Sequence, residues 1–155
     1  MPIEPPVTSP SDLWDAYEAL AVGSSAQPVR PIAGGTDLMV ALTGEIGDPP
    51  STLVDLWAID ALRGIAIQGD ALSLGALTTY TEIRDSAVLA RRYPMLPMAA
   101  SETGGLATQN RGTIGGNIAN ASPAADTPPA LLVYDVELEL MSAAGTRRVP
   151  YATFH

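Results

Sequence analysis

The 155-residue sequence predicts an α+β fold with two lobes, an N-terminal β-α-β lobe at residues 1–62 and a mixed lobe with antiparallel strands at residues 63–155. Three observations predict it: a strand, helix, strand pattern early in the chain, two hairpin patterns further on, and short helix patterns between the hairpins. A chain of this length buries roughly 70% of its unfolded surface, so a hydrophobic core is expected. Because no long linker separates the lobes, we expect them to form one unit.

The N-terminal lobe is predicted to contain an amphipathic helix within "SPSDLWDAYEALAVG". Ser9 can cap this helix, Pro10 can occupy its first position, and Asp12 stands where a capping box has a carboxylate. Gly23 can end it. The segment therefore predicts one helix of about three turns ahead of the next strand.

The segment "PVRPIAGGTDLMVALTG" combines a strand, a double-glycine turn and a helix. We expect the strand at residues 29–33 and the helix from Thr36 or Asp37 to just before Gly44. The following "TLVDLW" predicts another strand and completes the β-α-β lobe. A glycine turn that leads from a strand into a helix is the geometry of an anion-binding site.

The second lobe is predicted to begin and end with hairpins. "GIAIQGDALSLGA" predicts two strands that turn at residues 69–70, and "VELELMSAAGTRRVP" predicts a closing hairpin around residues 144–145. The segment between them carries helix-forming residues interrupted by Pro94 and Pro97. It predicts two or three short helices.

Composition excludes several classes of function. The net charge of −9 argues against a broad nucleic-acid-binding face and against a polybasic membrane anchor. No stretch approaches 18 consecutive apolar residues, and the first residues lack the basic and then apolar pattern of a secretory signal. We therefore expect a cytoplasmic protein without membrane insertion.

Missing residue types exclude further chemistry. The chain contains no Cys, which removes disulfides, thiol catalysis and iron–sulfur ligation, and no Lys, which removes a Walker lysine and a Schiff base. The single histidine is His155 at the C-terminus, so neither a Ser–His triad nor a multi-His metal site is expected. The sequence thus predicts no catalytic residue and no metal ligand, and assigns the chemistry to a cofactor or a partner.

Two glycine motifs, residues 33–37 ("AGGTD") and residues 113–117 ("TIGGN"), each pair two glycines with short polar side chains. Glycine lets a ligand approach the backbone closely, and each amide hydrogen bond to a charged oxygen contributes about 1.5–3 kcal/mol. The motifs therefore suggest a pyrophosphate bound mostly by backbone N–H groups. Two plain turns remain an equally open interpretation, since neither motif is a Rossmann fingerprint. We expect the surrounding residues 110–129 to be largely irregular.

Together, "PIAGGTDLMV" and "NRGTIGGNIANASPAADTPPALL" resemble the flavin-binding subunits of the molybdenum hydroxylases, the family of xanthine dehydrogenase and carbon monoxide dehydrogenase. "LGALTTYTEI", "YPMLPMAAS" and "VPYATF" resemble further family segments in the same order, so the similarity covers nearly the whole chain. The resemblance implies a two-lobed PCMH-type FAD-binding fold with FAD between the lobes.

The resemblance also implies which residues bind FAD. Residues 31–38 would surround the pyrophosphate and ribityl region, residues 113–117 would cover the diphosphate from the other lobe, and Asp126 would accept hydrogen bonds from FAD hydroxyls. Asp126 is also well placed to cap a helix that starts at "TPPALL". The implied cofactor-binding residues are Pro31, Ile32, Ala33, Gly34, Gly35, Thr36, Asp37, Leu38, Thr113, Ile114, Gly115, Gly116, Asn117 and Asp126.

The role that the resemblance implies is electron transfer by an oxidoreductase subunit that is active only with its partners. Substrate would be oxidised in a molybdopterin-binding large subunit, electrons would cross an iron–sulfur subunit, and FAD would pass them to NAD, oxygen or a quinone. Family subunits continue beyond the position of Phe154 into a further domain, so we expect either a fragment or a short form with a more open flavin site. The alternative is a non-catalytic assembly module that binds FAD weakly or not at all.

Overall fold

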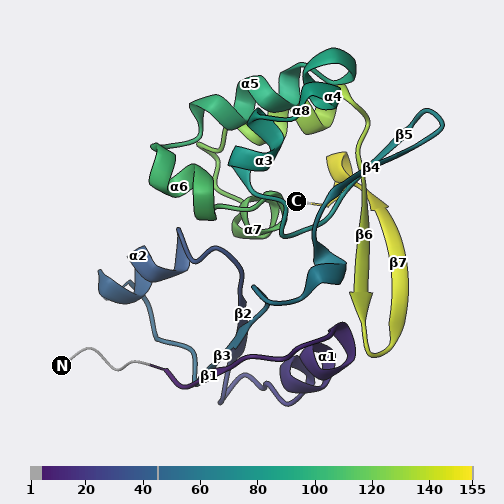
Figure 1. Ribbon diagram of the computed structural model, residues 1–155. Coiled ribbons are helices and arrows are strands. Elements are labelled where there is room, and N and C mark those ends of the chain that lie inside the picture. The colour runs from purple at the N-terminus through teal and green to yellow at the C-terminus, as the bar shows by residue number, and fades with distance from the viewer. Residues whose placement is uncertain (1–4, 45, 155) are drawn as a thin grey trace.

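The computed structural model describes residues 5–44 and 46–154, and it confirms the predicted α+β fold. The predictions that concern residues 1–4 and His155 lie outside the described residues. A small parallel sheet forms one part of the molecule, and a cluster of short helices with two hairpins forms the rest (Figure 1).

The N-terminal sheet has the strand order β1-β3-β2, and both pairings are parallel. Its strands are β1 (Val7–Thr8), β2 (Val29–Ile32) and β3 (Thr52–Asp55), connected through α1 (Leu13–Ala21) and α2 (Leu38–Thr43). The β-α-β arrangement is therefore confirmed. The sequence did not reveal β1, because two residues that follow two prolines give no alternating pattern.

The start of α1 differs from the prediction. Its N-cap is Asp12, whose Oδ1 accepts a hydrogen bond from the backbone N–H of Asp15 at 2.9 Å. The predicted cap at Ser9 is wrong by one turn, because an aspartate caps as well as a serine and Asp12 directly precedes the first helical residue. At the other end, the N–H of Gly23 bonds to the carbonyl of Leu20 at 3.3 Å, just after the helix ends.

Both predicted hairpins are confirmed. β4 (Ile65–Gln68) pairs antiparallel with β5 (Ala71–Leu74) through a turn in which Gly69 has a φ of 61°. β6 (Glu137–Ser142) pairs antiparallel with β7 (Gly145–Pro150), and its turn falls one residue earlier than predicted. Each hairpin forms a sheet of two strands.

The short helices of the second part are α3 (Tyr80–Arg84), α4 (Ala87–Arg92), α5 (Met95–Glu102), α6 (Leu106–Arg111), α7 (Ile114–Asn120) and α8 (Thr127–Val133). The first three confirm the short helices predicted around Pro94 and Pro97. The expectation that residues 110–129 are irregular is wrong, because α7 and the start of α8 lie there. The prolines at 128 and 129 fall in the first turn of α8, where a missing N–H costs little.

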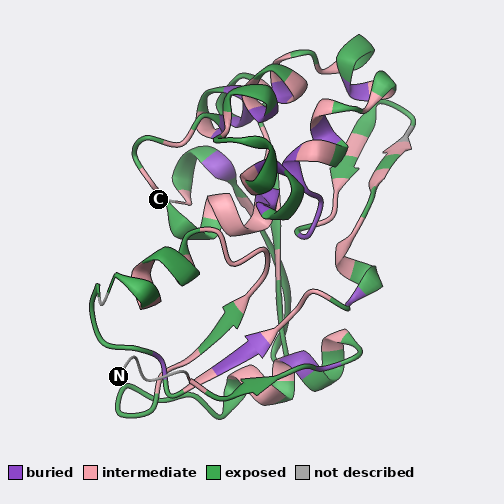
Figure 2. Ribbon diagram, turned by 60° about the vertical axis from the view of Figure 1, so that its left-hand side comes forward, coloured by how far each residue is buried: buried purple, intermediate pink, exposed green. Residues whose placement is uncertain are grey.

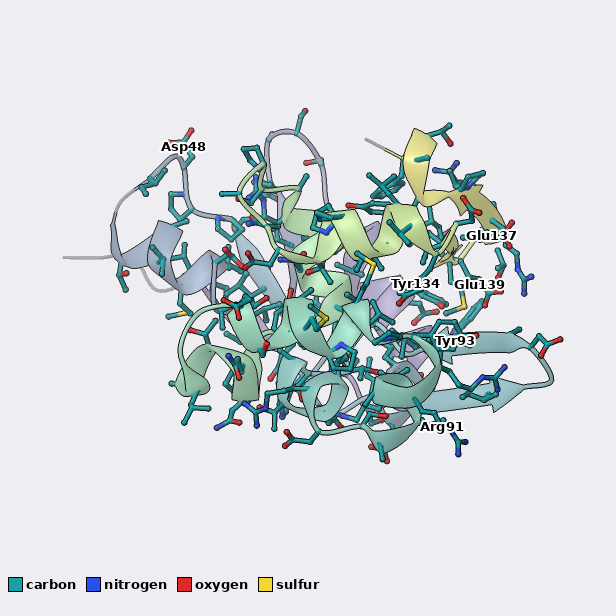
Figure 3. The ribbon with its side chains drawn as sticks, turned by 90° about the horizontal axis from the view of Figure 1, so that it is seen from above. Asp48, Arg91, Tyr93, Tyr134, Glu137 and Glu139 are labelled. Atoms are coloured by element: carbon teal, nitrogen blue, oxygen red, sulfur yellow. The ribbon has the colours of Figure 1, made fainter. Side chains whose placement is uncertain are left out.

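The core lies mainly among α3, α4, α5 and α8, and its most deeply buried side chains include Ile83, Leu89 and Ala100. Figure 2 shows that buried residues concentrate in these helices and in β3. Beside them, the rings of Tyr93 and Tyr134 meet edge to face with centroids 5.4 Å apart, near the start of β6 (Figure 3). Each fully buried leucine or isoleucine stabilises the fold by about 1.5–3 kcal/mol, so these helices form the stable core of the molecule.

Two 3-10 turns, Asp60–Leu62 and Tyr151–Thr153, complete the secondary structure of the described residues. Within residues 5–44 and 46–154, no helix combines the length and the apolar character needed to cross a membrane.

Candidate functional site

The two glycine motifs, far apart in the sequence, lie side by side in the structure. The first glycine loop, residues 33–37, joins β2 to α2, and the second glycine motif, residues 113–117, forms the start of α7 (Figure 1). A Cβ built on Gly116 would lie 3.9 Å from the Cβ of Ala33. Since β2 and β3 are parallel and end together, this is the carboxyl edge of the sheet, where open α/β sheets bind ligands.

The first glycine loop has the features of an anion-binding site. Within the described residues, the backbone N–H groups of residues 34–37 have no acceptor. Gly35 has a φ of 77°, a conformation that favours glycine, and its carbonyl accepts from the N–H of Met39 at 2.9 Å. Four consecutive free donors ahead of a helix can bind a phosphate without a cationic side chain.

The second glycine motif behaves differently. The N–H of Gly115 donates to the carbonyl of Ala76 at 2.9 Å, and the N–H of Gly116 donates to Oγ1 of Thr113 at 3.1 Å. The N–H of Asn117 donates to the carbonyl of Thr113 at 3.0 Å. The prediction that the amides of this motif point outward to a ligand is therefore wrong, because these amides belong to a helix start and to a pairing with the segment before α3.

Two glycines are required by contacts within the protein. A Cβ on Gly34 would overlap the carbonyl oxygen of Arg111, so the first glycine loop approaches the end of α6 backbone to backbone. A Cβ on Gly115 would lie 2.7 Å from the Cβ of Ala76. Close chain packing, and not ligand approach alone, therefore explains why glycine occupies both positions.

Next to the two motifs lies a chain of hydrogen-bonded, buried polar side chains that the sequence did not reveal. The hydroxyls of Tyr80 and Thr127 are 3.4 Å apart, and Oγ1 of Thr127 donates to Oδ1 of Asn117 at 2.9 Å. Tyr80 is 2% exposed and Thr127 1% exposed. Both residues stand inside the quoted motifs, "TTYTEI" and "DTPPALL", but nothing local signals that they meet. The side-chain oxygen of Asn117 is therefore engaged by Thr127 inside the protein.

The pKa of Tyr80 shows which charged groups surround this chain. Burial, aided by the carboxylates of Asp37 and Asp126, raises the pKa of Tyr80 from 10.0 to about 12, while hydrogen bonds from Thr127 and Asn117 oppose the rise. Asp37 from the first glycine loop and Asp126 from the start of α8 thus lie near one hydroxyl. The structure therefore brings together three of the predicted residues, Asp37, Asn117 and Asp126, from three separate elements.

The capping role predicted for Asp126 is only partly correct. Asp126 occupies the N-cap position of α8, but its φ of −79° and ψ of −22° are helical, and its side chain makes no cap hydrogen bond. Its carboxylate is exposed beside the glycine motifs. It is therefore available to accept hydrogen bonds from a ligand.

A cavity of about 430 Å³ lies elsewhere, between the start of α1 and the 3-10 turn at Asp60–Leu62. Its lining includes Leu13, Trp14 and Ile59, but no residue of either glycine motif. Among the described residues, no group of three or more His, Cys, Asp or Glu side chains could hold a metal ion.

Residues 2–155 match the family model described as the FAD binding domain in molybdopterin dehydrogenase. The chain belongs to this family. The resemblance read from the two glycine motifs is thereby confirmed, and so is the prediction of FAD as the cofactor.

Three known proteins illustrate the similarity. The chain is 37% identical over 144 residues to the xanthine dehydrogenase FAD-binding subunit of Escherichia coli O157:H7, covering 92% of this chain and 48% of that protein. It is 32% identical over 137 residues to the glyceraldehyde dehydrogenase medium chain of Sulfolobus acidocaldarius, covering 88% and 48%. The chain therefore spans about half the length of the curated relatives that it matches.

The third is a solved structure of the carbon monoxide dehydrogenase from Hydrogenophaga pseudoflava, in a form that lacks the Mo-pyranopterin moiety of the molybdenum cofactor. It superposes with a TM-score of 0.93 at 29% identity and covers 99% of this chain and 53% of that one. The FAD-binding fold predicted from the sequence is confirmed by this agreement.

Proposed function

We propose that this chain is the FAD-binding part of the electron-transfer component of a molybdenum-containing hydroxylase or dehydrogenase, and that it passes electrons from iron–sulfur clusters to an external acceptor. Membership of the family supports the proposal, as do relatives named as FAD-binding subunits and medium chains of dehydrogenases. The single observation in the structure that carries it is the run of free N–H groups in residues 34–37, at the carboxyl edge of the parallel sheet.

We propose that FAD lies between the lobe formed by residues 1–62 and the lobe formed by residues 63–155. Residues 31–38 lie on one side of it and residues 113–117 on the other. The N–H groups of residues 34–37 bind the diphosphate, and the first turn of α7 lies beside it, since Gly116 carries no side chain to fill the space next to Ala33. Asp126 accepts hydrogen bonds from FAD hydroxyls. Bound FAD supplies the redox chemistry, and this chain supplies binding and orientation.

The proposed partners are an iron–sulfur subunit and a molybdopterin-binding large subunit, with NAD, oxygen or a quinone as the acceptor and the cytoplasm as the location. A chain without cysteine cannot ligate an iron–sulfur cluster itself. Copurification of the full-length protein from its native host is expected to yield both partner subunits and a flavin spectrum. A lone, colourless protein would contradict this proposal and favour a non-catalytic assembly module.

The amide site predicts strong preference for FAD over FMN. The four free amides suit the diphosphate bridge, which FMN lacks together with the adenosine. Loss of two charge-assisted hydrogen bonds corresponds to about 3 kcal/mol or more, so FMN is expected to bind at least about 100-fold more weakly. Titration followed by flavin fluorescence measures both affinities. Equal affinity for FMN and FAD would mean that the diphosphate does not sit on the first glycine loop.

A pair of glycine variants separates ligand binding from folding. Gly35→Ala forces a positive φ on alanine and places a methyl 3.3 Å from Cδ1 of Ile32, so it is expected to cost about 1 kcal/mol of stability and to weaken FAD binding. Gly116 lies in α7 without a positive φ, so Gly116→Ala gains helix propensity of up to about 1 kcal/mol. The new Cβ would also lie 2.9 Å from Oγ1 of Thr113, which caps α7, and this close contact offsets the gain. Its methyl would still enter the space beside Ala33 and weaken FAD binding.

Melting temperature and FAD affinity are measured on both variants. Gly116→Ala is the sharper test, because the gain in helix propensity and the close contact with Thr113 act on stability in opposite directions, whereas both the Gly35→Ala strain and its methyl contact lower it. Wild-type affinity in both variants would remove the two glycine motifs from the FAD site.

A further inference from the structure

An aromatic ring with two arginines over it lies at the same sheet edge as the first glycine loop. Trp57 is the second residue after β3, and its backbone N–H donates to Oδ1 of Asp55 at 2.9 Å, which fixes the turn after the strand. The Cζ atom of Arg63 lies 4.5 Å from the centroid of the Trp57 ring, and the Cζ atom of Arg111 lies 3.7 Å from it. Both distances are in the range of cation–π contacts.

The two arginines differ in what else they contact. Arg63 donates from Nη2 to the backbone carbonyl of Trp57 at 2.6 Å, so its guanidinium is engaged by the turn that it stacks on. Arg111 makes no side-chain hydrogen bond and no ion pair within the described residues. Arg111 is exposed, so the five N–H donors of its guanidinium, which is always charged, remain open to a ligand.

The backbone of Arg111 places this cation beside the free amides. Its carbonyl oxygen lies so close to Gly34 that a Cβ there would overlap it. A guanidinium is planar and suits bidentate contact with phosphate oxygens, and stacking on an indole ring fixes its plane in advance. The Trp57 ring therefore holds a phosphate-binding group next to a loop whose N–H groups also suit phosphate.

The charge of the surroundings favours such a cationic group. The chain carries a net charge of −9, and the carboxylates of Asp37 and Asp126 lie close to the glycine motifs. A diphosphate brings further negative charge into this acidic surrounding. Neutral amide N–H groups can donate hydrogen bonds to its oxygens but cannot offset the repulsion, whereas a guanidinium can do both.

We propose that Arg111 binds the diphosphate of FAD and that Trp57 is the positioning residue that orients it. The inference rests on the proposed function and adds a cation to a site otherwise built from backbone groups. It assigns to the end of α6 a charged contact with the cofactor, whereas the glycine motifs contribute only neutral N–H groups to its diphosphate.

The test compares the full chain with Arg111→Gln and with a control, Arg147→Gln, which removes an exposed arginine from β7. Affinities for FAD and for ADP are measured by calorimetry at several salt concentrations, together with melting temperatures. Arg111→Gln is expected to weaken both ligands by about 10- to 100-fold, the effect of losing hydrogen bonds to a charged group. Its affinity is also expected to depend less on salt than that of the wild type, since one charge contact is gone. Arg147→Gln is expected to match the wild type in every measurement.

Two further variants test orientation. Arg111→Lys keeps the charge without the planar fork, and Trp57→Leu keeps Arg111 without the ring, so each is expected to weaken FAD and ADP by about 3- to 10-fold. Wild-type affinity in Arg111→Gln, or weakened affinity with an unchanged salt dependence and a lower melting temperature, would overturn the inference, since the latter pattern marks a purely structural contact. If the wild-type chain binds neither FAD nor ADP, the proposed function fails as well.

Discussion

Gly34→Ala is expected to be the most destabilising single-methyl change in the first glycine loop. The new Cβ would overlap the carbonyl oxygen of Arg111, and both groups belong to backbone that cannot rotate away. The loop would have to move away from the end of α6, at a cost of about 3 kcal/mol or more. For a protein of this size, that loss corresponds to a fall in melting temperature of roughly 6–12 °C. FAD binding is expected to fall with it, because the free amides of residues 34–37 depend on the position of the loop.

Gly105→Ala provides the matched control. Gly105 is the N-cap of α6, has a negative φ, and a Cβ there would meet nothing within 4 Å. Its replacement is expected to cost less than about 1 kcal/mol and to leave FAD binding unchanged. Thermal melts and flavin titrations of the two variants decide the matter. A Gly34→Ala protein as stable as Gly105→Ala would show that the two backbones do not approach as closely as described.

Elements that depend on short-range chemistry could be predicted from the sequence. The hairpin at residues 65–74 follows from a Gly-Asp turn between alternating residues, and Gly69 has the positive φ that this turn needs. The order β2, glycine loop, α2 follows from a β-branched strand, paired glycines and an apolar helix. In each case the residues that determine the element are its own neighbours in sequence.

Features that depend on distant segments could not be predicted. Gly115 and Gly116 look like a turn in isolation, yet they begin α7, because Thr113 caps that helix and is itself paired with Thr79 in a β-bridge. That pairing joins positions 34 residues apart, and no local pattern announces it. The sequence therefore marks these glycines as important, but it does not reveal that their N–H groups donate to atoms of the protein and not to a ligand.

The candidate site shows the same division. Family resemblance located the two glycine motifs and Asp126, which the fold brings together. The contact of Trp57 with Arg111 was missed, although Arg111 stands inside the second quoted motif, since the two residues lie in different parts of the chain and nothing local signals that they meet. Free and engaged amides can be told apart only when every acceptor is in place. The tertiary fold, more than the local motif, thus determines which of the two glycine motifs has N–H groups free to bind a ligand.

Tyr80→Phe is expected to make the protein much less sensitive to alkaline unfolding. Burial, aided by the carboxylates of Asp37 and Asp126, raises the pKa of Tyr80 from 10.0 to about 12 in the folded state. Between these values the unfolded chain loses the phenolic proton while the folded chain keeps it, so stability is fully present below pH 10 and falls as pH rises toward 12. Two pKa units correspond to about 2.7 kcal/mol of stability lost over this window.

Urea unfolding at a series of pH values from 7 to 11.5 measures the effect. At pH 7, Tyr80→Phe is expected to be about 1 kcal/mol less stable than the wild type, because Thr127 loses its hydroxyl neighbour. The gap is expected to close and then reverse above pH 10, since phenylalanine has no proton to lose. Tyr17→Phe, a change of the same kind on α1, is expected to keep the steep alkaline loss of the wild type, because Tyr80 remains. If both variants lose stability equally fast above pH 10, the hydroxyl of Tyr80 does not occupy the buried position between Thr127 and the two carboxylates.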